Sequence, residues 1–170
     1  MGGGWKHEGA FNLSGLYYDN RGDENSFDGS QWAWKTTFAN VGALVRFPHK
    51  IEVLAQRMWG RTSEITYDGP AKVNAPFRTT FGMISIPLGR SRVSARYETF
   101  AVDSEGASHA NSTKERGRAW TAAYVLRVGA SHRFALEVLR VVSDRPDRAV
   151  VALPPHAVEL QAQASFQFHF

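Results

Sequence analysis

The chain of 170 residues has the size of one domain, and its apolar and aromatic content is sufficient to bury a core. The formal net charge is +4 and there is no cysteine, which excludes a disulfide framework, a thiolate metal site and a cysteine nucleophile. No apolar run approaches the roughly 20 residues of a transmembrane helix. That observation excludes only helical spans, because strands that cross a membrane are half polar.

Alternation of apolar and polar residues predicts an all-β protein with about eight strands. The expected strands run, in chain order, over residues 5–18, 31–47, 50–62, 77–88, 92–102, 118–128, 132–143 and 158–170. The third is the least regular, because Arg57 interrupts the apolar set formed by Ile51, Val53, Ala55 and Trp59.

The connections between these strands alternate between long and short. Long polar stretches rich in Gly, Asn, Asp and Pro follow the first, third, fifth and seventh strands, and the short links are Pro48-His49, Gly89-Arg90-Ser91 and Gly129-Ala130-Ser131. Tight turns join antiparallel neighbours. The order therefore predicts a single domain over residues 1–170, an up-and-down antiparallel barrel with both chain ends on the tight-turn side.

Periodicity leaves open whether the apolar side chains point into a soluble barrel or out toward lipid. Three features favour a transmembrane β-barrel: strands of ten or more residues, aromatic residues near strand ends, and charges of both signs in the middle of strands. The aromatic residues are Trp5, Tyr17, Trp32, Trp34, Phe47, Trp59, Phe77, Trp120, Phe166, Phe168 and Phe170. The candidate pore-lining residues are Glu52, Arg96, Glu98, Arg127, Arg133, Glu137, Glu159, Gln161 and Gln163.

These polar residues have two readings. They line a pore, in which Arg96, Arg127 and Arg133 attract anions while Glu98, Glu137 and Glu159 balance them, or they form a structural network of ion pairs inside a narrow barrel. A barrel of eight strands favours the second reading, and a wider barrel favours the first.

The chain ends in "VELQAQASFQFHF", which alternates without a break up to a final phenylalanine. Such an ending resembles the signal by which bacterial outer-membrane barrels are recognised for insertion. The matching residues are Val158, Leu160, Ala162, Ala164, Phe166, Phe168 and Phe170. The stretches "WAWKTTFANVGALVRFPHKIEVLAQRMWGRT", "VSARYETFAVDSEG", "ERGRAWTAAYVLRV" and "HRFALEVLRVVSDRP" are similar, in pattern more than in motif, to the C-terminal half of proteobacterial porin-like proteins, including relatives of phosphate-selective porins.

The resemblance implies a passive diffusion channel for small polar or anionic solutes in the bacterial outer membrane. Its partners would be outer-membrane lipid and lipopolysaccharide, the barrel-assembly machinery and the solutes, with a homo-oligomer compatible with the family. Porins of this kind have about sixteen strands. With about eight strands and no signal peptide at its start, the chain corresponds to the C-terminal part of a larger barrel or to a complete small one.

The sequence offers little support for other activities. The six histidines lack ligand spacing and no serine lies in a nucleophile elbow, so we expect no enzyme, no metal and no cofactor. The oxygen ligands Asp19, Asp23, Asn25 and Asp28 resemble those of a calcium loop, but the glycine and the terminal glutamate of an EF-hand are not in place, so a solvated loop is favoured. The arginines form no stripe, which speaks against nucleic acid. Two alternatives remain: a closed eight-stranded membrane barrel that acts through its long loops, and a soluble lipocalin-like binding barrel.

Overall fold

The structure is a computed structural model that describes residues 2–7 (backbone only), 10–29, 32–65, 72–104, 114–129 and 131–168. It is all-β. One sheet contains nine strands, and each pairs antiparallel with the next along the chain. The strands are β1 (Gly2–His7), β2 (Phe11–Asp19), β3 (Trp34–Arg46), β4 (Glu52–Ile65), β5 (Lys72–Leu88), β6 (Ser91–Asp103), β7 (Lys114–Val128), β8 (His132–Asp144) and β9 (His156–Phe168); two 3-10 turns, η1 (Pro48–Lys50) and η3 (Pro146–Val151), precede β4 and β9.

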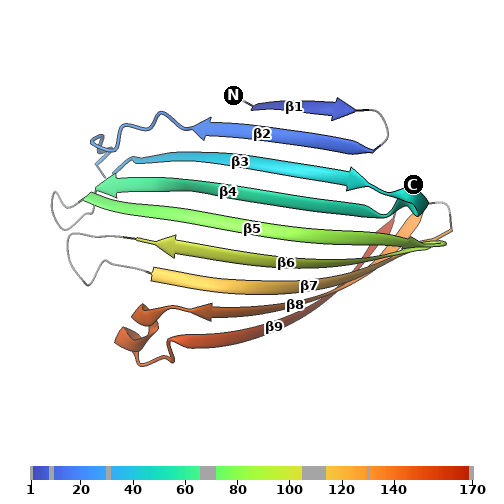
Figure 1. Ribbon diagram of the computed structural model, residues 1–170. Coiled ribbons are helices and arrows are strands. Elements are labelled where there is room, and N and C mark those ends of the chain that lie inside the picture. Colours follow the sequence, from blue (N-terminus) through green and yellow to red (C-terminus); the bar gives the residue numbers. More distant parts are fainter. Residues whose placement is uncertain are drawn as a thin grey trace.

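The alternation of long and short connections is confirmed. Figure 1 shows a single curved sheet with the tight turns at one end of the strands and the longer loops at the other. Two of the tight turns contain glycines with positive φ, Gly89 at 61° and Gly129 at 69°, a conformation that glycine adopts without steric cost. Among the described residues, no helix has the length and apolarity needed to cross a membrane.

The number of strands differs from the prediction. The expected strand 5–18 is two strands, β1 and β2, and they pair with each other so that Trp5 lies opposite Leu13. Apolar residues stay on odd positions on both sides of the turn, so periodicity alone does not reveal it. β1 begins part-way along the sheet and runs toward the tight turns, whereas the chain leaves β9 at the tight-turn end (Figure 1). This corrects the prediction that both chain ends lie on the tight-turn side.

Several strands also extend beyond their predicted bounds. β4 continues to Ile65, while β5 begins at Lys72 and β7 at Lys114. Hairpin pairing continues there through polar residues, for example Ser63 opposite Asn74 and Asp103 opposite Lys114. The predicted loops are therefore partly strand, because backbone pairing does not require apolar side chains.

The sheet is not closed. β1 and β9 occupy its two edges, and each of the other strands has a neighbour on both sides. The nine strands thus form a curved open wall, and the closed eight-stranded barrel is not the arrangement of this chain.

Residues that lie opposite each other in neighbouring antiparallel strands share one face of the sheet. One such row is apolar across eight strands: Phe11, Val45, Val53, Ile84, Ala95, Ala122, Val138 and Ala162. We call the face that carries this row the apolar face. The other face, which carries Glu52, Arg96 and Glu98, is the polar face.

The apolar face is the more exposed of the two. Along β4 to β7 its residues are mostly exposed, whereas those of the polar face are mostly half-buried. Trp120 is 51% exposed and Leu160 74% exposed, both on the apolar face. Because the inner side chains of a curved sheet crowd and shield one another, this difference indicates that the polar face is concave.

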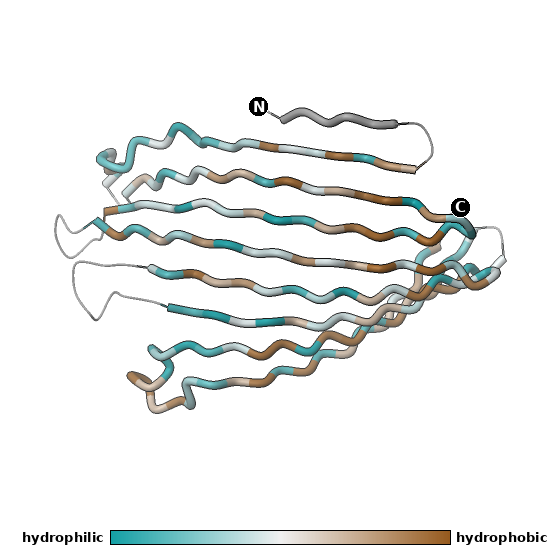
Figure 2. Tube along the Cα trace, viewed as in Figure 1, coloured by the Kyte–Doolittle hydropathy of each residue, from teal (hydrophilic) through white to brown (hydrophobic). Residues whose placement is uncertain are grey.

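Little of the described chain is packed as a core. Its buried apolar residues are only Ala101, Ala119 and Val142, and it has no large side chain that is fully buried. In Figure 2 hydrophobic segments are more frequent toward the tight-turn end and hydrophilic ones toward the long loops. A single layer with one uncovered apolar face is not stable in water by itself, so this face requires a cover of lipid or protein.

Candidate functional site: the polar face of the sheet

All nine predicted pore-lining residues lie on the polar face. The register places Ser94, Ala123, Glu137 and Gln163 in one row and Arg96, Thr121, Leu139 and Gln161 in the next. The same face carries residues 52, 98, 127, 133 and 159, each of which lies an even number of positions from a polar-face residue of its own strand. The pattern of alternation thus assigned the face correctly, and the role of these residues as a pore lining stays a prediction.

Arg96 and Glu98 form an ion pair near the middle of β6. Arg96 Nη2 lies 2.5 Å from Glu98 Oε2, and Thr79 Oγ1 donates to Glu98 Oε1 at 2.9 Å. The Arg96 guanidinium also lies 4.2 Å from the centre of the Phe81 ring, a cation–π contact. Both charges are therefore held in place by contacts between β5 and β6, which favours the structural reading for this pair.

Glu52 lies between two arginines at the tight-turn end of the polar face. Its Oε1 accepts from Arg46 Nε at 3.2 Å, and its Oε2 accepts from Arg92 Nη1 at 2.8 Å. Arg92 also donates to Ser85 Oγ at 2.9 Å. Sequence reasoning singled out only Glu52 from this network. Odd and even numbering along β6 places Arg92 on the same face as Arg96, so the sequence could have assigned Arg92 to the polar face. The contact between residues 52 and 92 depends on the register between strands, which this numbering does not provide.

Arg127 and Arg133 lie directly opposite each other on β7 and β8. Both are exposed, and neither forms an ion pair among the described residues. Like charges in this position repel and are tolerated best where water surrounds them. This end of the polar face therefore keeps uncompensated positive charge.

The remaining predicted residues lie on β8 and β9. Glu137 is opposite Gln163, and Glu159 is opposite Val141. A hollow of about 320 Å³ lies beside them, lined by Leu139, Val141, Glu159, Leu160 and Gln161. The structure thus places ion pairs near Glu52 and Arg96, whereas Arg127, Arg133, Glu137 and Glu159 form none among the described residues.

The residues of the predicted insertion signal that the structure describes lie on the apolar face. Val158, Leu160, Ala162, Ala164, Phe166 and Phe168 belong to the apolar face, as their partners on β8 show. Phe166 and Phe168 contact each other with ring centres 4.5 Å apart, and His132 packs against both. Phe170 lies outside the described residues.

The predicted aromatic girdles are only partly formed. Tyr17, Trp59, Trp120, Phe166 and Phe168 belong to the apolar face, as their registers place them. Trp34 and Phe77 have the opposite parity and lie on the polar face, while Trp32 packs on Phe27 in the β2–β3 loop. The side chain of Trp5 lies outside the described part of the chain. Proximity to a strand end therefore did not suffice to assign an aromatic residue to a face.

The β2–β3 loop binds the rim of the sheet through Glu24. Its carboxylate accepts hydrogen bonds from Ser63 Oγ on β4 and from Lys72 Nζ on β5. The bond from the Lys72 ammonium, followed by that from Ser63, holds the pKa of Glu24 below its ordinary value. Asp19 and Asp23 each accept from a backbone amide two residues ahead, so these carboxylates stabilise local turns. Among the described residues, no group of acids and histidines is arranged to hold a metal ion.

Acidification is expected to release this loop. A carboxylate with a lowered pKa stabilises the folded contact above its ordinary pKa, and the contribution is lost as the pH falls through the lowered value. A nitroxide attached at Ser26→Cys should be immobilised at neutral pH and become mobile in acid, and no other cysteine competes for the label. With Glu24→Gln in the same background the label should be mobile at both pH values. Identical spectra for the two proteins at neutral pH would contradict the tether.

The fold and the polar face define a class: a single-layer antiparallel meander with one exposed apolar face and one charged, concave face. No family model and no curated protein matches this chain. The function is therefore argued from the geometry of the two faces.

Proposed function

We propose that this sheet is part of the wall of an outer-membrane β-barrel of the porin type, which conducts small polar or anionic solutes by passive diffusion. The observation that carries the proposal is the exposure of the apolar face together with the confinement of the strand glutamates to the polar face. In a membrane barrel apolar side chains face lipid and polar ones face the lumen. A soluble lipocalin-like barrel would have the reverse arrangement, with the apolar set on the shielded side.

Strand length supports the same proposal. β9 has 13 residues, and its apolar side extends from Val158 to Phe168. These ten steps span about 34 Å at roughly 3.4 Å per residue, and a tilt near 45° converts this length to about 24 Å. The result matches the apolar band of outer-membrane barrels, about 25 Å tall.

The open edges of the sheet support a barrel larger than eight strands. β1 and β9 each present one row of backbone groups that no strand of the sheet pairs. Unpaired backbone groups are not tolerated inside a bilayer. We infer that both edges pair with further strands, and that the closed barrel is wide enough to hold water beside the polar face.

In this barrel the solute moves along the polar face. Arg96 is compensated by Glu98, so it contributes a fixed, nearly neutral pair. Arg127 and Arg133, near the tight turns, lack such partners among the described residues and attract anions, while Glu137 and Glu159 on β8 and β9 limit that preference.

Conductance in planar bilayers tests the proposal. Protein purified from membranes in folded form should produce discrete conductance steps, because each inserted barrel opens one water-filled path. A folded, membrane-embedded barrel that never conducts would contradict the channel, and a monomer that stays soluble without detergent would contradict the membrane barrel itself.

A further inference from the structure

Five arginines gather on the apolar face, at the side nearer the long loops: Arg61, in the row opposite Pro76, and four that lie in the two rows next to it. Arg57 on β4, Arg78 on β5, and Arg116 and Arg118 on β7 are all exposed. Two adjacent rows of the register contain them. One row carries Arg57, Thr80, Thr99 and Arg118, and the other Trp59, Arg78, Ala101 and Arg116. Three of these arginines, with Thr80 and Thr99, line one hollow of about 340 Å³: Arg57, Arg78 and Arg116.

The negative charge closest to this cluster comes from two aspartates at strand ends, Asp103 on β6 and Asp144 on β8, which share its face. The six glutamates of the described strands are all on the polar face: Glu52, Glu64, Glu98, Glu115, Glu137 and Glu159. Arg116 pairs with Asp103 at 3.3 Å. Arg57, Arg78 and Arg118 form no ion pair among the described residues. The Arg57 guanidinium lies over the Trp59 ring, 5.9 Å from its centre.

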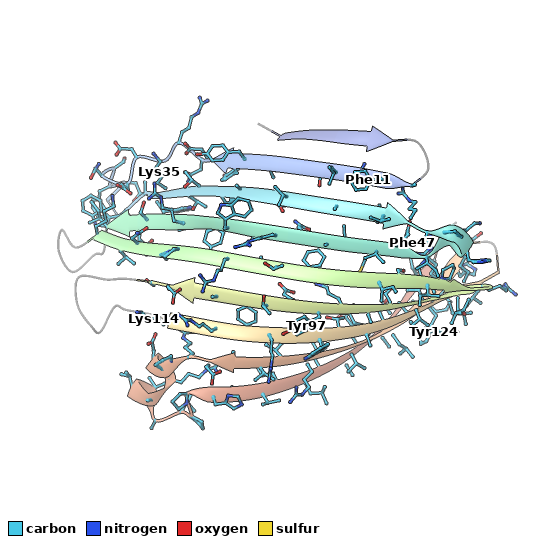
Figure 3. All side chains as sticks on the ribbon, viewed as in Figure 1. Phe11, Lys35, Phe47, Tyr97, Lys114 and Tyr124 are labelled. Carbon is cyan, nitrogen blue, oxygen red and sulfur yellow. The ribbon has the colours of Figure 1, made fainter. Side chains whose placement is uncertain are left out.

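An apolar hollow lies directly beside the cluster on the same face. It measures about 710 Å³ and is lined mostly by apolar residues, among them Ile84, Ala95, Tyr97 and Trp120, with Arg140 on its β8 side. Tyr97 and Trp120, with ring centres 4.2 Å apart, are two residues along the chain from Thr99 and Arg118. Two residues of a strand span about 7 Å, so one elongated molecule reaches both hollows. The apolar face becomes more basic toward the long loops. In Figure 3, Tyr97 lies near the middle of the strands, and Lys35 and Lys114 lie at the long-loop end.

We propose that the cluster of Arg57, Arg78 and Arg118 binds the head group of an anionic phospholipid whose acyl chain lies in the apolar hollow beside Tyr97 and Trp120. This inference rests on the proposed function, because it requires the apolar face to contact a membrane. Arginine binds phosphate through two parallel hydrogen bonds, and the threonine hydroxyls between the arginines supply further donors.

The energetics of arginine in a membrane favour this occupant. An arginine on the lipid face is costly at the bilayer midplane and nearly without cost near the interface. Three guanidinium groups without carboxylate partners are therefore tolerated where lipid phosphates supply the counter-charge. On this view Arg57, which interrupts the apolar pattern of β4, marks the position at which that strand leaves the apolar part of the bilayer.

Native mass spectrometry of the protein released from defined vesicles tests the site. Vesicles that contain equal amounts of phosphatidylglycerol and phosphatidylcholine offer the same phosphodiester with and without net charge. The wild-type protein should retain phosphatidylglycerol preferentially. The variant Arg57→Gln/Arg78→Gln/Arg118→Gln should lose most of that preference, at least about tenfold in occupancy, since glutamine cannot replace the charge-assisted hydrogen bonds between guanidinium and phosphate.

A matched control removes the same charge elsewhere. Arg90→Gln/Arg127→Gln/Arg133→Gln lies at the tight-turn end and should retain phosphatidylglycerol as the wild type does. Equal loss in the two triple variants would overturn the site, as would equal retention of both lipids by the wild type. Displacement of the lipid by inorganic phosphate would show a site for free anions instead. If the triple variant does not fold, Arg57→Gln and Arg118→Gln carry the comparison singly.

Conductance of the same preparations separates the two proposals. A wild-type protein that conducts but retains no anionic lipid overturns the lipid site and leaves the channel standing. A folded protein that retains the lipid and never conducts overturns the channel alone.

Discussion

Arginine at Ala122 is expected to destabilise the folded protein in lipid vesicles by about 2–4 kcal/mol, whereas arginine at the next residue, Ala123, should cost little. The two alanines differ in face. Ala122 belongs to the row that is apolar across eight strands, and Ala123 lies opposite Glu137 on the polar face. The free energy of unfolding from vesicles in urea, measured for Ala122→Arg and Ala123→Arg, gives the comparison.

The physical reason for the difference is the medium on each face. Ala122 is exposed, and an exposed substitution in water changes stability by no more than about 0.5 kcal/mol. A large cost at Ala122 therefore requires that lipid, and not water, covers this face. Ala123→Arg places a guanidinium beside a carboxylate and serves as the matched control. A larger cost at Ala123 than at Ala122 would contradict the outward direction of the apolar face.

Reversing the charge of Arg127 and Arg133 together should convert an anion preference of the channel into a cation preference. The two side chains lie opposite each other without ion-pair partners among the described residues, so Arg127→Glu/Arg133→Glu changes the local charge by about four units. One unit charge about 7 Å from an ion in water changes its energy by about 0.6 kcal/mol, a factor of about three. Allowing for screening by salt, we expect the permeability ratio to shift by roughly tenfold.

The measurement is the reversal potential in a salt gradient across a planar bilayer. The control variant Arg21→Glu/Arg90→Glu reverses the same number of charges outside the polar face, in the β2–β3 loop and the β5–β6 turn. Its permeability ratio should stay close to that of the wild type. If the double reversal at residues 127 and 133 leaves selectivity unchanged while conductance persists, solutes do not pass along this part of the polar face.

Alternation in the sequence was sufficient to assign residues to faces, because a strand places successive side chains on opposite sides. Arg96 and Glu98, two residues apart, had to share a face wherever the strand lay, and the structure pairs them. Turn chemistry was equally local: Gly89 and Gly129 marked two tight turns. Both inferences depend on neighbours along the chain, which a sequence contains directly.

Pairing across strands was not accessible in the same way. Glu52 reaches Arg92, which is 40 residues away, and the three arginines of the proposed lipid site come from β4, β5 and β7. Such partners depend on the register, and a shift of one residue would exchange the faces of a whole strand. The turn between β1 and β2 was missed because the apolar parity is the same on both sides of it.

By itself, the sequence determined that this protein is an up-and-down sheet with one apolar and one polar face, because period two and turn residues are local properties of the chain. Only the tertiary structure decided that the sheet is curved and open, that the polar face is the shielded one, and which charges meet on each face. These features arise from backbone pairing over long sequence separations and from the curvature of the whole sheet, and neither is encoded in any single strand.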